Sequence, residues 1–385
     1  MDKVFSVDDA RLILASHRVN GLSVTADEYI RNYRRVLAKG LERTCLIYLD
    51  TNYWIWLREA ELGRGSAEQC DLLRLLRAGV RSRKLLCVSH FNSLTELGKQ
   101  EGVSLRVTAR LLDELTEGVA MASAADLLEW DCSQFIRETV GITVGVGLFN
   151  WTKAGQMHRN TLPQTMPGPV TEIGRNAILK CLIDTFWNAK FEDIFEAFNW
   201  DTKRVFTESI DSETIAAVED IKSKSHAQED SREKVRRVNF RQHVVKQLKP
   251  IFAKQLLDWH VASSKSLDID VAKKQLQLFV DAAICKFNER TLGKFLPCFA
   301  LPTELYALYE TSPTSRHLTA NDWIDWNHAA AALPYCDLFF TERHLAHQLR
   351  QELRADKQYD CVVCGTISEA LKVLGEARER EYVAK

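Results

Sequence analysis

The feature that most constrains the fold is a short, nearly continuous apolar run at residues 44–50, which ends in the carboxylate of Asp50. A strand that is apolar at consecutive positions is typical of a parallel sheet covered on both faces, because successive side chains point to opposite faces. Thr51 then follows as a turn or helix-capping residue, and a helix is expected to begin at residues 53–57. The run therefore predicts a strand followed by a helix in an α/β protein.

The same alternation continues along the first third of the chain. We expect an amphipathic helix at residues 67–80, a second strand at 84–88, and a helix at 90–100 that is capped by Ser89. Further on, the pattern indicates a helix at 103–117, a possible strand at 118–123 and a helix at 124–139. Strands and helices in this order predict right-handed crossovers and a parallel sheet.

The end of the chain returns to this pattern after a long helical segment. Strands are expected at 338–341 and 361–364, and helices at 322–333, 343–353 and 367–374. Between the two α/β parts, the sequence is rich in Phe, Trp and Lys and has no alternating strand pattern. The predicted organisation is a helical N-terminal segment (1–43), two parts of one α/β domain that share a parallel sheet flanked by helices (44–140 and 302–385), and a mostly α-helical insertion (141–301).

Composition excludes few classes of protein. Lys and Arg (51) nearly balance Asp and Glu (52), so the net charge of −1 neither indicates nor excludes a nucleic-acid partner.

The acidic N-terminus is unlike a signal peptide and no long apolar run occurs, so we expect a cytoplasmic protein without membrane association. The ten cysteines are expected to be reduced, and Cys361 and Cys364, although spaced like metal ligands, fall in an expected strand. The sequence also lacks a Gly-x-Ser-x-Gly elbow and a Walker-type phosphate loop.

Acidic residues stand near the expected carboxyl ends of three strands. Open parallel sheets bind their ligands at this edge. Asp50 ends the first strand, Glu96 lies on the helix after the second strand, and Glu342 directly follows the strand at 338–341. Asp337 lies at the opposite end of that last strand, so we expect it to have a structural role. The order of elements thus predicts that the other three acids face one another.

Asp322 and Asp325 are three residues apart at the start of an expected helix, near one face of it. Either can cap the helix and interact favourably with its dipole, by about 0.3–1 kcal/mol. Alternatively, one of them joins the acids at the sheet edge. Mg²⁺ and Mn²⁺ prefer oxygen ligands, and a bound cation activates water for attack on a phosphodiester. Acids that converge from separate elements are typical of such a site.

Three segments together resemble the PIN domain family of metal-dependent ribonucleases. Residues 46–52 resemble its first motif, residues 89–97 its second, and residues 325–343 its third acid, the following strand and its fourth site. The resemblance covers residues 44–130 and 320–375 and implies a central parallel sheet, as in the toxins of bacterial toxin and antitoxin pairs. This chain departs from the family in two ways: Arg343 stands where a fourth acid is often found, and PIN domains usually lack a long helical insertion.

Carried over to this chain, the resemblance implies a site for Mg²⁺ or Mn²⁺. Asp50, Glu96 and Asp325 would be catalytic residues and metal ligands, with Asp322 as the rival for the third place. Glu342 would be a weaker fourth acid, or would hold a water that binds the metal.

Several other residues are candidates for contact with RNA. The basic run at residues 231–249, with Phe240 and His243 interleaved, either follows phosphates or is the solvated face of a helix. Arg343 and His344 adjoin the expected site and are expected to bind substrate.

Aromatic and polar residues near the acids have two interpretations each. Asn52, at the start of its helix, is expected to contact substrate. Tyr53, Trp54 and Trp56 either stack on bases or belong to the core. His328 either orients a carboxylate or a phosphate, or is a buried histidine whose hydrogen bonds are satisfied.

Taken together, these patterns predict a metal-dependent endoribonuclease. The size of the chain and the insertion further indicate a regulated effector, such as a toxin or an antiviral defence protein, with a regulatory or inhibitory protein partner and the possibility of an oligomer. The alternative is a catalytically inactive PIN-like protein that acts as a protein or RNA binding module, in which the acids serve as helix caps.

Overall fold

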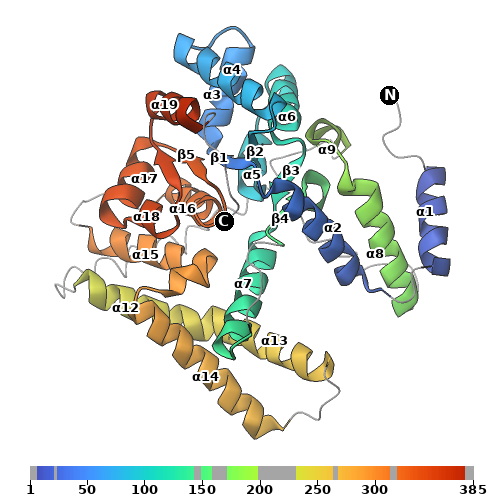
Figure 1. Cartoon of the computed structure of the whole chain (residues 1–385), viewed down its shortest axis with the longest axis vertical. Coiled ribbons are helices and arrows are strands. Elements are labelled where there is room, and N and C mark those ends of the chain that lie inside the picture. The colour runs from blue at the N-terminus through green and yellow to red at the C-terminus, as the bar shows by residue number, and fades with distance from the viewer. Residues whose placement is uncertain are drawn as a thin grey trace.

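Four parallel strands form the central sheet of the computed structural model, in the order β2-β1-β5-β6 (Figure 1). The strands are β1 (Cys45–Leu49), β2 (Leu85–Val88), β5 (Leu338–Phe340) and β6 (Val362–Cys364). All five residues of β1 are buried, and Ile47 pairs with Leu338 of β5. The predicted α/β architecture is therefore confirmed in its main feature, because strands from both ends of the chain share one sheet.

The structure describes residues 7–20, 24–142, 149–157, 171–197, 231–262, 268–312 and 319–377. None of the helices in these ranges combines the length and the apolar character that crossing a bilayer requires. The helices that flank the sheet are α3 (Thr51–Glu61), α4 (Ala67–Arg81), α5 (Phe91–Leu97), α6 (Gly102–Thr116), α16 (Ala320–Ala332), α17 (Arg343–His347), α18 (Ala355–Gln358) and α19 (Ile367–Ala377).

Two helix predictions near the sheet edge need correction. The helix expected at 343–353 ends at His347 and passes into a π-helical turn, η4 (Gln348–Glu352). The cap of α5 is His90 and not Ser89, since the His90 ring accepts a hydrogen bond from the backbone N–H of Asn92. Ser89 instead forms a bridge with Ala120 of a second sheet.

That second sheet is small and antiparallel. It consists of β3 (Val119–Met121) and β4 (Trp151–Lys153). The short helix η1 (Ala154–Gln156) directly follows β4. The strand expected at 118–123 thus forms, but it pairs outside the main sheet. No strand was expected between residues 141 and 301, so β4 corrects that part of the prediction.

The remaining helices build the part of the molecule below the sheet and beside it in Figure 1. They are α1 (Val7–Asn20), α2 (Ala26–Leu41), α7 (Ala124–Thr139), α8 (Glu172–Trp187), α9 (Phe191–Ala197), α12 (Arg232–His243), η2 (Val244–Leu248), α13 (Lys249–Ala262), α14 (Ile269–Asn288), η3 (Leu292–Lys294) and α15 (Pro297–Thr311). Helix α7 leads from the sheet region to α13 and α14, as Figure 1 shows. A second hydrophobic core forms here, in which Phe135 of α7 stacks on Phe252 and Phe240 stacks on Phe287.

The N-terminal helices are attached to α8 through one carboxylate. Asp184 on α8 accepts hydrogen bonds from the hydroxyls of Tyr29 and Tyr33 at 2.8 and 3.0 Å, and its other oxygen lies 2.7 Å from Nε2 of His17. Three side chains from α1 and α2 therefore meet one acidic residue of the expected insertion. The boundaries expected at 43/44, 140/141 and 301/302 stay predictions.

A buried acid on α7 joins the helical part to the α/β part. Helix α15 has no side-chain cap of its own. Instead, Asp131 accepts a hydrogen bond from the backbone N–H of Cys298 in the first turn of α15. The single hydroxyl proton of Tyr335 is shared between the two carboxylate oxygens of Asp131, at 3.0 and 3.2 Å. Burial raises the pKa of Asp131 to about 7, although these hydrogen bonds act in the opposite direction.

The substitution Asp131→Asn tests this pKa. Between an ordinary pKa of about 4 and the raised value, the folded protein holds a proton that the unfolded chain has lost. The wild type should therefore lose stability as pH rises through this window, by at most about 1.4 kcal/mol per pH unit. Asn does not titrate, so the variant should gain stability relative to wild type between about pH 5 and pH 8 in urea denaturation.

The exposed substitution Val36→Ala on α2 provides a control that removes no titratable group. The difference in unfolding free energy between Val36→Ala and wild type should stay constant over the same range. A constant difference for Asp131→Asn would contradict the raised pKa.

Candidate metal centre

Asp50 is held rigidly at the carboxyl end of β1. Its carboxylate accepts a hydrogen bond from the Thr51 backbone N–H at 2.6 Å and another from the Thr341 hydroxyl at 2.9 Å. The residue caps α3 and is only 3% exposed. Because Thr341 follows β5, the side chain is fixed by the ends of two neighbouring strands, as its place in the sequence predicts.

Glu96 reaches the same edge from α5, one residue before the helix ends. One oxygen of its carboxylate accepts a hydrogen bond from the Thr51 hydroxyl and lies 3.0 Å from Nε2 of His328. Burial acts to raise the pKa of Glu96, but the contacts with His328 and Thr51 lower it below its ordinary value. The carboxylate is thus stabilised in its charged form, which is the form that binds a cation.

His328 on α16 is fully buried and faces these acids. Its Nδ1 lies 2.6 Å from the Tyr48 hydroxyl, and the two rings pack edge to face. Burial opposes a charge on the ring, yet Glu96 and Asp50 raise the pKa of His328. The two interpretations left open by the sequence therefore combine, because this histidine is buried with satisfied hydrogen bonds and also orients a carboxylate of the site.

Asp50, Glu96 and His328 form a group that could hold a metal ion. One possible ligand atom from each lies within 4.8 Å of the other two. Two ligands at about 2.1–2.3 Å from a shared ion are at most about 4.5 Å apart, so only small side-chain movements separate this geometry from a bound state. Asp50 directly follows β1, Glu96 lies on α5 and His328 lies on α16. Glu342 was expected to face Asp50 and Glu96, but among the described residues neither Glu342 nor Asp325 is part of this converging group.

Asp325 interacts electrostatically with this group, whereas its rival Asp322 makes a capping contact. Burial, followed by the charges of Asp50 and Glu342, raises the pKa of Asp325 to about 8. The carboxylate of Asp322 instead forms a capping box, accepting hydrogen bonds from the backbone N–H and the hydroxyl of Thr319 at 2.8 and 2.6 Å. Asp322 thus makes a capping contact with Thr319, whereas Asp325 is the acid whose pKa is affected by the charges of Asp50, Glu342 and Glu96.

The rim of the site carries the residues expected to contact substrate. Glu342 starts α17 without making a side-chain capping bond, and its charge acts on Asp325. Asn52, Arg343 and His344 are exposed. Their side chains are therefore accessible, and their roles stay predictions.

Two aromatic candidates for base stacking belong to the core. Tyr53 and Trp54 are fully buried, so their rings cannot reach a nucleic acid. Trp56 is partly buried and packs against the same core. Asp337 has the structural contact expected of it, because it accepts a hydrogen bond from the Leu46 backbone N–H at 2.7 Å.

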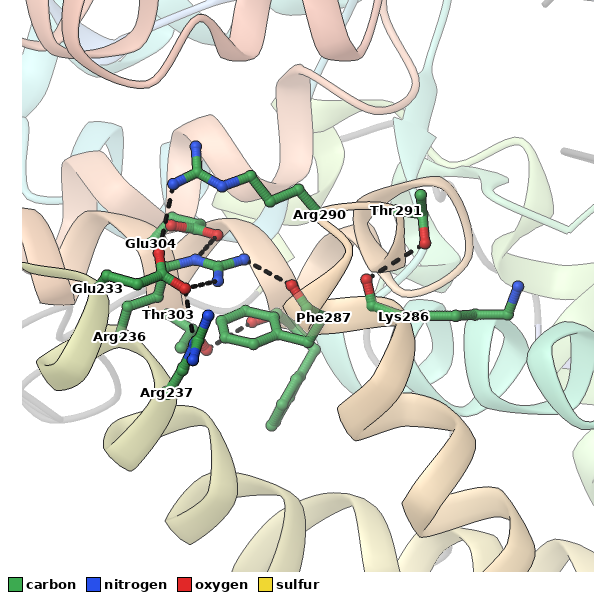
Figure 2. Close-up of polar contacts among 10 residues, drawn as sticks. Glu233, Arg236, Arg237, Lys286, Phe287, Arg290, Thr291, Thr303 and Glu304 are labelled. Carbon is green, nitrogen blue, oxygen red and sulfur yellow. Dashed lines mark hydrogen bonds and ion pairs between the residues drawn. The ribbon is translucent and has the colours of Figure 1, made fainter.

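The basic run at 231–249 is partly structural (Figure 2). Arg236 is 2% exposed, and its guanidinium contacts Glu304, Glu233 and the backbone oxygen of Phe287. Phe240 is fully buried against Phe287, so it is not available to bases. The His243 side chain lies outside the described residues. Several other basic residues of the run are exposed. The prediction that Phe240 lies among them as an accessible ring is wrong, because its side chain is buried.

Sequence reasoning missed the polar residues that hold the site. Tyr48 occupies a position in an apolar run, where a phenol needs a hydrogen-bond partner once it is buried; this was the available signal. The sequence pattern predicts Thr51 only as a turn or helix-capping residue and Thr341 only as the end of a strand. His90 was not singled out, although it is 2% exposed, and burial together with His328 lowers its pKa to about 3.

Cys361 and Cys364, which are spaced like metal ligands, are both buried and form no disulfide. Within the described ranges, no cysteine belongs to a metal-holding group.

No protein-family profile, curated protein or solved structure matches this chain. Geometry and sequence pattern are therefore the basis for assigning a function.

Replacing Asp325 with Asn tests the electrostatic account of the site. In a chelator above about pH 8, the variant should melt at a higher temperature than wild type, because one repelling charge is gone. In a chain of this length, about 1 kcal/mol corresponds to about 1 °C. With excess Mn²⁺ the order should reverse, since wild type gains about 2.7 kcal/mol at a hundred times its dissociation constant. A variant that is less stable in chelator, or equally stabilised by Mn²⁺, would contradict the account.

Proposed function

We propose that this protein is a metal-dependent nuclease that hydrolyses phosphodiester bonds in RNA. The observation that carries the proposal is the convergence of Asp50, Glu96 and His328, from three separate elements, within 4.8 Å of one another. They meet at the carboxyl ends of parallel strands, the edge where open α/β sheets bind ligands. The resemblance to PIN domains supports the same activity.

The residues of the site have separable tasks in this proposal. Asp50 and Glu96 bind Mg²⁺ or Mn²⁺, and Asp325 adds a third carboxylate whose unfavourable charge the cation neutralises. When bound, such an ion supplies an activated water and neutralises the charge that develops on the phosphate. Glu342 holds a water at the rim of the site.

Several fixed contacts favour catalysis. Thr51 donates to both Asp50 and Glu96, through its N–H and its hydroxyl, and so sets their separation. Thr341 fixes the second oxygen of Asp50. Ligands that are held before the ion arrives need little reorganisation to bind it. Arg343 and His344 are exposed and directly follow Glu342. In this proposal they contact the phosphates of the substrate.

The choice of RNA as substrate, and a role as a toxin or antiviral effector under the control of a protein partner, follow from the resemblance alone. The acids do not distinguish RNA from DNA, because both present the same phosphodiester. A 2′-hydroxyl contact would make that distinction.

A cleavage assay tests the proposal. Wild-type protein with Mn²⁺ should degrade total RNA, and chelator should stop the reaction. Asp50→Asn and Glu96→Gln should each lower the rate at least about 100-fold, because each loses a charged ligand. Asp71→Asn, an exposed substitution on α4, should retain full activity.

Equal cutting by wild type and Asp50→Asn would show that this site does not perform the reaction. Absence of cutting with both Mg²⁺ and Mn²⁺, together with RNA binding that none of these substitutions weakens, would favour the rival function of an inactive binding module.

A further inference from the structure

We infer that Nε2 of His328 is itself a metal ligand, and that this nitrogen makes the site select a first-row transition ion such as Mn²⁺ over Mg²⁺. The inference rests on the metal site of the proposed function and narrows which cation it takes.

The His328 ring is held as a metal-binding imidazole requires. The side chain is fully buried, Nδ1 lies 2.6 Å from the Tyr48 hydroxyl, and that hydroxyl lies 3.3 Å from Oγ of Ser93. If Nδ1–H donates to Tyr48 and Tyr48 donates to Ser93, the lone pair of Nε2 is free for a cation. Metal-binding histidines are generally oriented in this way, by a partner on the other ring nitrogen.

The spacing of His328 and Glu96 also fits two ligands of one ion. Nε2 and the nearest carboxylate oxygen are 3.0 Å apart in the metal-free chain. Two ligands at right angles, each about 2.2 Å from an ion, would be about 3.1 Å apart. In the metal-free chain this contact holds one proton, carried by Nε2 or by the carboxylate. A cation bound here would displace that proton to solvent, and it could also reach Asp50.

The composition of this ligand set argues against Mg²⁺ as the preferred ion. Mg²⁺ takes oxygen ligands in a strict octahedral geometry and retains several waters, so a rigid buried imidazole fits it poorly. Transition ions accept nitrogen with oxygen, and their affinities for such mixed sets rise from Mn²⁺ towards Cu²⁺. An imidazole beside the carboxylates of Asp50 and Glu96, with or without that of Asp325, therefore favours the transition ions.

A second buried histidine provides a matched control. His90 lies near enough to influence His328, and its Nε2 has no hydrogen-bond partner among the described residues. It is not part of the group whose possible ligand atoms converge. Asn is a favourable N-cap, so His90→Asn removes a buried imidazole while preserving a cap for α5.

The test is pulsed electron paramagnetic resonance of Mn²⁺ bound to the full-length protein. Wild type and His90→Asn should show coupling of the electron spin to one nitrogen, and His328→Gln should lose it. Mn²⁺ affinity should fall at least about 10-fold in His328→Gln, while Mg²⁺ affinity measured by competition should change less than about 3-fold.

Labelling all histidines of the wild type with ¹⁵N tests whether a histidine nitrogen binds Mn²⁺ without any variant. The inference therefore stays testable if His328→Gln misfolds. The coupling of the wild type should then change from that of ¹⁴N to that of ¹⁵N. Bound Mn²⁺ without nitrogen coupling would overturn the inference, as would coupling that survives in His328→Gln but disappears in His90→Asn.

The outcomes separate this inference from the proposed function. Nitrogen-coupled Mn²⁺ in a protein that cuts no RNA would support the ligand and refute the nuclease. RNA cleavage with Mg²⁺, and Mn²⁺ bound without nitrogen, would leave the nuclease in place and refute the ligand. No binding of Mn²⁺ at any concentration up to millimolar would overturn both.

Discussion

Parallel pairing between β1 and β5 is the contact on which the rest of the structure depends. It joins Ile47 to Leu338, and so brings the two ends of the α/β part into one sheet. The same pairing aligns the two ends of these strands. At the amino end of β5, Asp337 accepts a hydrogen bond from the backbone N–H of Leu46, and at the carboxyl end the Thr341 hydroxyl donates one to Asp50. A candidate site built from distant segments exists because these few backbone hydrogen bonds fix their register.

The burial of charged groups at the carboxyl ends of the strands then determines which of the acids are ionised and whether they can bind a cation. Glu96 is stabilised as an anion by His328 and Thr51, whereas Asp325 has the charges of Asp50 and Glu342 nearby and a pKa raised to about 8. Carboxylates held this close repel one another unless a proton or a cation lies between them. The metal-free fold therefore tolerates an unfavourable arrangement, which is common at functional sites and is relieved when the proposed ion binds.

The sequence predicted the sheet and the acids because both follow from local patterns. The apolar run that ends in Asp50 predicts a strand buried on both faces. The direction of the strands then places Asp50 at a carboxyl end, where sites form, and Asp337 at an amino end. It did not predict β4, a three-residue strand with too few positions to show a pattern. Nor did it choose between Asp322 and Asp325, since helical spacing puts both near one face. The capping contact of Asp322 with Thr319, and the burial of Asp325 beside the charges of the site, distinguish them in the structure.

The central claim is that one cation binds between Asp50, Glu96 and His328. The most direct measurement is an anomalous-scattering map from a crystal soaked in Mn²⁺. The account predicts one strong peak in contact with all three side chains, and loss of that peak in Asp50→Asn. A map with no peak there at millimolar Mn²⁺, or with an equal peak in the variant, would contradict it.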